Sequence, residues 1–304
     1  MKKLIALFAL VLAASLAVPA SANTNKALVI IDSGINPNLS WVKSMLIEEA
    51  CFIEYGKCPN GQASMVGQGA ATLSSADAVP DKSFNHGTQM ASVAYQVNPN
   101  TRLIMIRIIG RSDKGFANSY TTRGVTQALA WVAENVSKYN IGAVSLSMGR
   151  TYKEAACPIE SPLQQTVVQL RQAGVPVFAA SGNKSIHNRV DYPACIPEMI
   201  TVGATDRRYM LRGITGWVYP IMPISNGDNT QVDLFTMGRF TTTTLDGSST
   251  VSLGTSNATA AMASKWAQLT SDGSSYESVW SNIQSKFEKA YRSTSVAYQL
   301  QYTL

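Results

Sequence analysis

Short and almost wholly apolar runs recur along the chain and alternate with longer segments of helical period. Several of these runs are apolar at nearly every position, which is typical of β-strands buried on both faces of a sheet. Strands separated by helices in this way predict an α/β fold with a mainly parallel central sheet and helices on both of its faces. The predicted strands are KALVIID (26–32), TRLIMIRII (101–109), IGAVSLSM (141–148), VPVFAA (175–180) and EMITVGA (198–204).

Two segments between the strands carry apolar residues three and four positions apart, which predicts helices with one buried face. They are 119–137, which contains VTQALAWVAENV, and 161–173. Residues 276–291 (YESVWSNIQSKFEKAY) predict a closing amphipathic helix. The stretch 206–252 is rich in Gly, Thr and aromatic residues and predicts short strands and loops. Because neither a repeat nor a linker divides the chain, we expect one domain.

The first 22 residues differ in character from the rest of the chain. MKKLIALFALVLAASLAVPASA has a basic start, a short apolar stretch and small residues at Ala20 and Ala22. This pattern is typical of a secretory signal peptide, with cleavage expected between Ala22 and Asn23. A membrane anchor is disfavoured because the apolar part is short and ends in Pro19 and an A-x-A site. We therefore expect a folded domain of residues 23–304 that is secreted or periplasmic, with no membrane partner after cleavage.

Composition narrows the class of protein. Of the 304 residues, 45% are hydrophobic and 14% charged, against about 25% charged in an average soluble protein. Such a chain is able to bury a sizeable core and is not disordered. The net charge is +6, and removal of Lys2 and Lys3 with the signal peptide leaves about +4. Without a run of Lys or Arg, this mild charge gives no reason to expect a nucleic-acid partner.

Four cysteines in an exported chain predict disulfides, and four cysteines allow three pairings. Cys51 and Cys58 flank the short polar loop FIEYGK, which favours a bridge between them and leaves Cys157 to pair with Cys195. The other two pairings remain alternatives. A zinc site is disfavoured, because the chain has no C-x-x-C motif and only two histidines.

Two residues are candidates for acid–base chemistry, and the first lies at the carboxyl end of a predicted strand, where functional groups of parallel sheets gather. Asp32 ends the first apolar run, just before the turn SGINPN. His86, in SFNHGTQMASVAY, opens a helix of small residues and has a side chain suited to a general base. Structural roles are the alternative for both: an acid that accepts hydrogen bonds from its own turn, and a surface histidine. His187 lies in a polar loop without a comparable setting.

A helix of unusually small side chains supplies a candidate nucleophile. In LGTSNATAAMAS (253–264), Ser256 stands in the first turn, either as part of a helix cap or as a nucleophile beside free backbone N–H groups. A nucleophilic serine needs a base, a group that orients the base, and donors for the oxyanion. His86, Asp32 and the amide of Asn183, in VPVFAASGNKS, offer these parts.

The order Asp…His…Ser and the residues around each of the three resemble the subtilisin-like serine peptidase family, the subtilases. The three signature segments are similar to Asp32-Ser33-Gly34, His86-Gly87-Thr88 and Gly254-Thr255-Ser256-x-Ala258. AASGN (179–183) resembles the family's oxyanion-asparagine segment, and SLSMG (145–149) resembles the edge strand on which peptide substrate lies. The resemblance covers roughly residues 26 to 270, in order.

This resemblance implies a secreted serine endopeptidase that acts on a peptide or protein substrate. Ser256 would be the nucleophile, His86 the acid and base, Asp32 the group that holds the imidazole, and Asn183 an oxyanion donor. The loop 184–191, with Arg189 and Asp191, would form the floor of the specificity pocket. The implied substrate-binding residues are Ser145, Leu146, Ser147, Met148, Gly149, Ala180, Ser181 and Gly182.

The resemblance also sets expectations about cofactors and partners. No metal or cofactor is expected in the chemistry. Calcium often stabilises the family, but the sequence shows no contiguous calcium loop, so the metal site stays unknown. Most secreted members carry a folding pro-region, and none is evident here, so a separate folding helper or inhibitor is an expected partner. Two alternative functions remain: a catalytically silent peptide-binding protein, and a peptide ligase or cyclase that uses the same acyl-enzyme.

Overall fold

The structure, a computed structural model, describes residues 25–153, 156–209, 211–213, 216–227, 230–286, 288–292 and 295–301. The predicted signal peptide, residues 1–22, lies outside the described residues. Within the part of the chain that is described, no helix has both the length and the apolar character needed to cross a bilayer.

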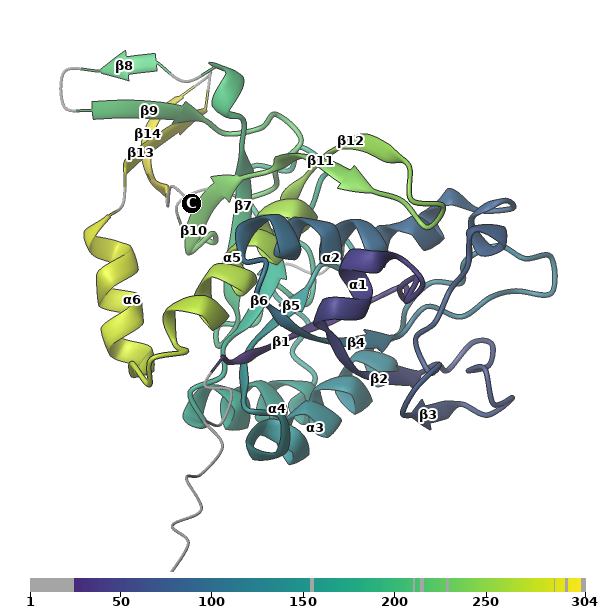
Figure 1. Ribbon diagram of the computed structural model, residues 1–304. Helices are drawn as coiled ribbons and strands as arrows, with labels where there is room; N and C mark the ends of the chain where they lie inside the picture. The colour runs from purple at the N-terminus through teal and green to yellow at the C-terminus, as the bar shows by residue number, and fades with distance from the viewer. Residues whose placement is uncertain are drawn as a thin grey trace, which may run out of the picture.

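Twelve strands among the described residues form one sheet, in the order β3-β2-β4-β1-β5-β6-β7-β10-β14-β13-β9-β8 (Figure 1). Neighbours from β2 to β10 in this order pair in parallel, which confirms the predicted sheet. The strands are β1 (Ala27–Asp32), β2 (Leu46–Phe52), β3 (Ser64–Val66), β4 (Arg102–Arg107), β5 (Ile141–Leu146), β6 (Val177–Ala180), β7 (Ile200–Thr205), β8 (Leu211–Gly213), β9 (Gly216–Pro220), β10 (Leu234–Met237), β13 (Glu288–Arg292) and β14 (Ser295–Gln301).

The five strands predicted from apolar runs are β1, β4, β5, β6 and β7. Strand β2 was not predicted, because its sequence LIEEACF carries two glutamates. One of them, Glu49, is buried and accepts hydrogen bonds from Gly69 N–H (2.6 Å), Ala71 N–H (3.1 Å) and the Thr72 hydroxyl (2.8 Å). Three donors from one loop thus allow a carboxylate to sit in a buried strand.

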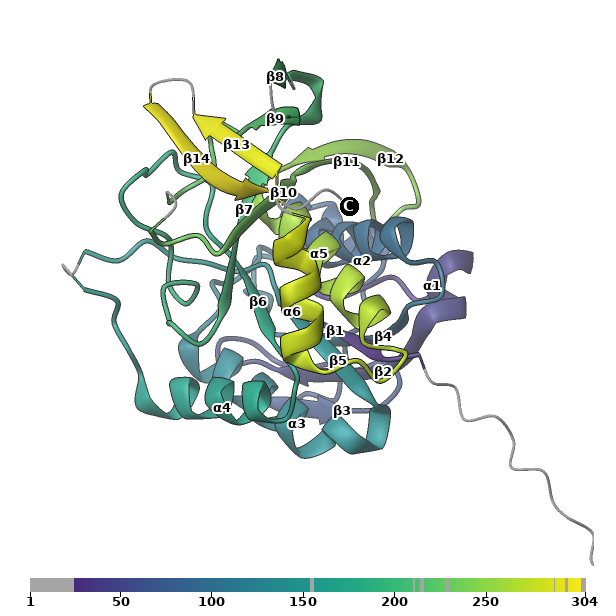
Figure 2. The same cartoon turned by 90° about the vertical axis from the view of Figure 1, so that its left-hand side faces the viewer.

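Helices cover both faces of the sheet and enclose two cores (Figures 1 and 2). On one face lie α3 (Thr122–Tyr139) and α4 (Ser161–Gln172), which match the predicted helices. On the other face lie α1 (Ser40–Met45), α2 (His86–Val97), α5 (Thr255–Leu269) and α6 (Tyr276–Ser285). A separate hairpin of β11 (Arg239–Thr243) and β12 (Ser249–Leu253) leads into α5. This hairpin, with β8 to β10, agrees with the short strands expected in 206–252.

The predicted closing helix over 276–291 is wrong in its second half. Helix α6 ends at Ser285, and β13 follows at Glu288–Arg292. There the backbone pairs with β14 on one side and β9 on the other. Strand pairing at the end of the sheet therefore overrides an amphipathic period that by itself favours helix.

The small side chains of α5 are explained by its place inside the molecule (Figure 2). Eleven of its fifteen residues are buried. It packs on the sheet and against α2, where the Ser264 hydroxyl donates to the Ala94 carbonyl at 2.9 Å. Alanine, serine and threonine at the contacts allow the helix to lie this close to its neighbours, and the larger Met262 and Trp266 are buried in the core beside it.

Both disulfides join the cysteines that the sequence favoured. Cys51 pairs with Cys58, and Cys157 pairs with Cys195. The second bridge connects segments 38 positions apart. It ties the chain just after Asp191 to the segment that follows β5.

We expect Ala261→Leu to destabilise the fold, because Ala261 is fully buried in α5. Overpacking a dense core costs about 1–3 kcal/mol. Urea denaturation should show a lower midpoint for this variant. Gln268→Leu adds a leucine at an exposed position of the same helix and should change the midpoint little. Equal midpoints for the two variants would contradict the tight packing of α5.

Candidate active site

Asp32 and His86 meet at the carboxyl end of β1. The Asp32 carboxylate is fully buried and accepts a hydrogen bond from the Ser33 N–H at 2.7 Å. Both carboxylate oxygens lie 2.9 Å from His86 Nδ1. His86 is the first residue of α2, and its side chain is 30% exposed. The pair therefore has one end buried and one end open to solvent.

Two glycines allow α2 to start against the turn that follows β1. A methyl group on Gly87 would lie 2.2 Å from the Gly34 carbonyl oxygen, and Gly34 itself has φ +124°. The Ser33 hydroxyl accepts from the Gly87 N–H (3.0 Å) and donates to the Phe84 carbonyl (3.1 Å). These contacts fix the start of α2, and with it His86, relative to Asp32.

The environment of His86 sets its protonation. Burial of the ring disfavours the charged form and lowers the pKa. The charge of Asp32 and its hydrogen bond favour the charged form by more, so the pKa of His86 lies above its ordinary value of 6.5. The pair consequently stabilises the folded chain below pH 6.5, and this stabilisation is lost as the pH rises through the higher folded-state pKa.

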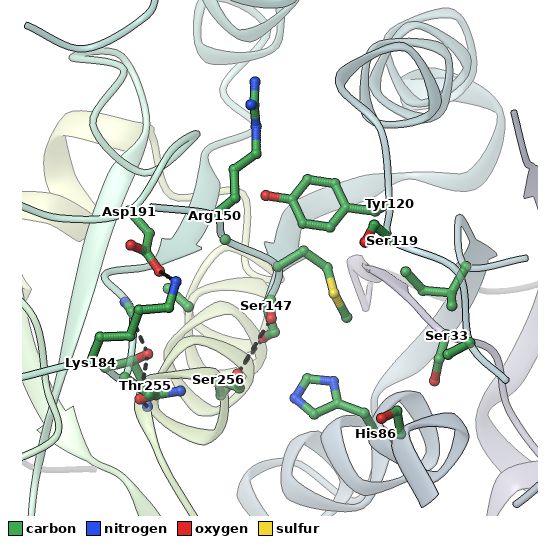
Figure 3. Close-up of a pocket in the computed structure, with 18 of the residues that line it drawn as sticks. Ser33, His86, Ser119, Tyr120, Ser147, Arg150, Lys184, Asp191, Thr255 and Ser256 are labelled. Carbon is green, nitrogen blue, oxygen red and sulfur yellow. Dashed lines mark hydrogen bonds and ion pairs between the residues drawn. The ribbon is translucent and has the colours of Figure 1, made fainter. Parts of the chain in front are cut away.

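Ser256 lies in the first turn of α5, across the cleft from α2. Gly254, just before the helix, has φ +147°, a conformation that favours glycine. The Ser256 hydroxyl donates to the Ser147 carbonyl at 3.4 Å, and the Ser147 hydroxyl donates to the Ser256 carbonyl at 3.1 Å. The His86 ring extends from α2 towards Ser256 (Figure 3). First-turn N–H groups of α5 lack acceptors within the helix, which favours negative charge here.

Asn183 is oriented by the residue next to Ser256. Its side-chain oxygen accepts from the Thr255 N–H (2.9 Å) and from the Thr255 hydroxyl (3.0 Å). With its oxygen bound in this way, the amide is left with its NH₂ group as a donor. A methyl group on Gly254 would lie 3.0 Å from that nitrogen, so glycine there lets the amide approach the start of α5.

One cleft of about 640 Å³ joins these groups: His86, Asn183, Thr255 and Ser256 all line it. The predicted substrate-binding residues divide into two sets. Ser147, Met148, Gly149, Ala180 and Gly182 line the cleft. Ser145, Leu146 and Ser181 are buried and do not line it. In the loop 184–191, which was expected to form the floor of the specificity pocket, Asp191 lines the cleft, whereas Arg189 lies over the Tyr152 ring.

Several lining residues were not found from the sequence. They are Ser33, Asp81, Ser83, Ile109, the loop residues 117–120, Arg150 and Thr255. Lys184 also lines the cleft and belongs to the loop 184–191 that was expected to form the floor. Tyr120 and Arg150 carry no local pattern that marks them, because the loops that bring them to the cleft are placed by tertiary contacts. Thr255 is a different case. Its position beside Ser256 at a helix start was a usable signal for a residue that holds Asn183.

The fold and the cleft define an α/β protein that gathers its functional groups at the carboxyl edge of a parallel sheet. The family follows from comparison with known sequences. A sequence model of the Subtilase family matches residues 24–296, and the chain therefore belongs to that family.

Individual relatives are more distant. The chain is 28% identical over 149 residues to a cuticle-degrading serine protease of Arthrobotrys oligospora, a match that covers 48% of this chain and 33% of that protein. It is 31% identical over 131 residues to alkaline elastase YaB of Bacillus sp. (strain YaB), covering 40% of this chain and 30% of that protein. The chain thus matches about a third of the length of these curated relatives.

Solved structures support the same fold. A cold adapted subtilisin-like serine proteinase superposes with a TM-score of 0.67 at 22% identity, over 94% of this chain and 91% of that one. Sphericase gives a TM-score of 0.67 at 17% identity, over 91% of this chain and 90% of that one. Similarity at these identities concerns the fold.

We expect the imidazole of His86 to titrate with a midpoint above pH 6.5, because of Asp32. The chain has only two histidines, so proton NMR of the ring signals can follow both, with His187→Gln to assign them. Asp32→Asn should lower the midpoint of His86 below that of the unsubstituted chain, since the burial of the ring then acts without the opposing charge. An unchanged midpoint in Asp32→Asn would contradict the coupling.

Proposed function

We propose that this chain is a secreted serine endopeptidase that hydrolyses peptide bonds through an acyl-enzyme. The observation that carries the proposal is the pairing of buried Asp32 with His86, which lines the same cleft as Ser256 at the start of α5. Membership of the Subtilase family supports it. Named serine proteases among the relatives support it as well.

In the proposed acylation, the Ser256 oxygen attacks the carbonyl carbon of the substrate while His86 Nε2 accepts the hydroxyl proton. Asp32 holds the other ring nitrogen, which fixes the tautomer and stabilises the imidazolium. The carbon–nitrogen bond then breaks, and His86 returns the proton to the leaving amine. Water attacks the resulting ester with His86 again as base, and the proton finally returns to the Ser256 oxygen.

The oxyanion formed in each attack needs donors that are already in place. We assign this role to the NH₂ group of Asn183 and the backbone N–H of Ser256. Thr255 holds the Asn183 oxygen with two hydrogen bonds, so little reorientation of the amide is needed as charge develops. Loss of one such donor costs about 10²–10³ in kcat in a serine protease where this has been measured.

Peptide substrate would extend along residues 147–149, which continue from β5 at the rim of the cleft. Main-chain hydrogen bonds of the β-sheet kind would hold it there, because an extended peptide can add as a strand to such an edge. The Ser147 carbonyl lies within 3.4 Å of the Ser256 hydroxyl. A peptide aligned on this segment therefore presents its carbonyl groups beside the nucleophile.

Export is part of the proposal. The two disulfides fit an oxidising compartment, and the pattern of residues 1–22 is that of a signal peptide. A separate folding helper or inhibitor remains a proposed partner. Each catalytic step uses a side chain or a backbone group of this chain.

Peptide hydrolysis should fall as the solution is acidified. His86 accepts a proton only when its ring is neutral, and Asp32 raises its pKa above 6.5. The acidic limb of kcat/KM against pH is therefore expected above pH 6.5 and at the midpoint that His86 shows in NMR. A limb far below the NMR midpoint would show that His86 is not the base.

Ser256→Ala should reduce peptide hydrolysis by a factor of about 10⁶ with the fold intact, because the nucleophile is lost. The measurement is intact mass after a fluorophosphonate probe, together with cleavage of an unfolded protein substrate. One adduct on the native chain and none on Ser256→Ala is the expected result. Ser285→Ala, which removes an exposed hydroxyl at the end of α6, is the matched control and should keep the adduct.

The same experiment separates the alternatives. A folded native chain without adduct or cleavage contradicts the proposal and supports a catalytically silent peptide-binding protein. An adduct accompanied by peptide products joined to an added amine, with no gain of water, supports a ligase or cyclase. Product mass distinguishes hydrolysis from acyl transfer directly, because hydrolysis adds water and transfer adds an amine.

A further inference from the structure

A buried carboxylate borders the cleft on the side of Ser256 away from His86 (Figure 3). Asp191 is only 3% exposed, yet it lines the cleft. Its carboxylate lies between two backbone segments, because a methyl group on Gly182 would be 2.6 Å, and one on Gly149 3.5 Å, from Asp191 Oδ2. The Gly182 N–H in turn donates to the Thr255 hydroxyl at 3.3 Å, next to Ser256. A long side chain placed beside Ser256 therefore has a carboxylate within reach.

Asp191 has two neutral hydrogen-bond donors and one cation as partners. The Thr151 hydroxyl (3.1 Å) and the Asn226 amide (3.4 Å) donate to Oδ1 and are neutral. The cation is Lys184, whose Nζ lies 3.2 Å from Oδ2. The Lys184 side chain is 50% exposed, while that of Asp191 is 4% exposed. The charge that balances a buried carboxylate thus sits on a flexible side chain already half in water.

The pairing of a buried carboxylate with a half-exposed lysine favours one chemical class of substrate side chain. A guanidinium or ammonium group that enters the cleft can replace Lys184 at Asp191, and Lys184 then moves fully into solvent at small cost. The buried carboxylate remains paired throughout. An arginine would add a two-pronged hydrogen bond that lysine cannot make.

The other classes are disfavoured by the same contacts. An acidic side chain would draw Lys184 away and leave Asp191 buried without a cation, which is strongly unfavourable. A large apolar side chain would cover the ion pair and remove water from it without supplying a new partner. Arg150 also lines the cleft, but its side chain points away from Asp191 (Figure 3) and lies over the Tyr192 ring and 3.7 Å from Glu160.

We propose that Asp191 is a specificity-determining residue that selects arginine or lysine as the substrate residue whose carbonyl Ser256 attacks, and that Lys184 occupies its place when substrate is absent. This inference rests on the proposed peptidase function. The inference specifies which substrate side chains the same cleft would accept.

The test uses internally quenched peptides that differ only in the residue before the cleaved bond: Arg, Phe or Glu. Product masses identify the bond, and kcat/KM is measured for each peptide. We expect the Arg peptide to exceed the Phe peptide by about 10- to 100-fold, the range for one charge-assisted hydrogen bond. Asp191→Asn should remove this advantage, since the amide keeps the shape but not the charge.

A second variant keeps the test decisive should Asp191→Asn fold poorly. Lys184→Met retains the aliphatic stem and removes the competing cation, so it should increase the Arg-to-Phe ratio. Lys43→Met removes the same charge at an exposed position on α1 outside the cleft and should leave the ratio unchanged. A native preference for Phe that neither variant alters would overturn the inference.

Failure of catalysis and failure of specificity are separable by binding. Fluorescence anisotropy of the Arg and Phe peptides on Ser256→Ala reports selectivity without hydrolysis. Tighter binding of the Arg peptide supports the role of Asp191 even where the native chain cleaves nothing, which would contradict only the peptidase function. Equal binding of both peptides, together with cleavage by the native chain, overturns the role of Asp191 alone.

Discussion

The site depends on the burial of one carboxylate at the carboxyl end of β1. Asp32 is fully buried, and a buried charge persists only where it is paired and hydrogen-bonded. The Ser33 N–H and the ring of His86 meet this need. Since His86 is the first residue of α2, pairing the carboxylate also determines where that helix begins. The close contact of Gly87 with Gly34 then follows from the position of α2.

Close packing also determines the position of α5. This helix lies against the sheet and α2 with its alanines at most 1% exposed, so its first turn reaches the edge of the sheet beside β5. Ser256 consequently faces the segment that carries Ser147, and Thr255 holds Asn183. Side chains that look featureless in sequence thereby set the place of the candidate nucleophile and of the candidate oxyanion donor. The close packing of α5 therefore accounts both for its small side chains and for the position of the candidate catalytic groups.

The charged groups of the candidate site differ in how deeply they are buried. Two acids of the candidate site, Asp32 and Asp191, are buried, and each is paired with a partly exposed group. For Asp32 the partner is His86, whose proton can be exchanged, which suits acid–base chemistry. For Asp191 the partner is Lys184, whose whole side chain can move, which suits exchange of one cation for another. The difference between a proton and a movable side chain separates the proposed catalytic role from the proposed specificity role.

The sequence by itself determined the local features: five strands from apolar runs, two helices from their period, the order of the Asp, His and Ser segments, and the favoured cysteine pairing. These depend on nearby residues or on recognisable motifs. Only the tertiary structure decided features that depend on distant contacts. Glu49 is allowed in β2 by donors from a loop some twenty residues away, and 288–292 became a strand because β9 and β14 lie beside it. The burial of Ser145, Leu146 and Ser181 belongs to the same class. Their physical reason is shared: which face of a segment is covered depends on what packs there, and a local pattern does not contain that information.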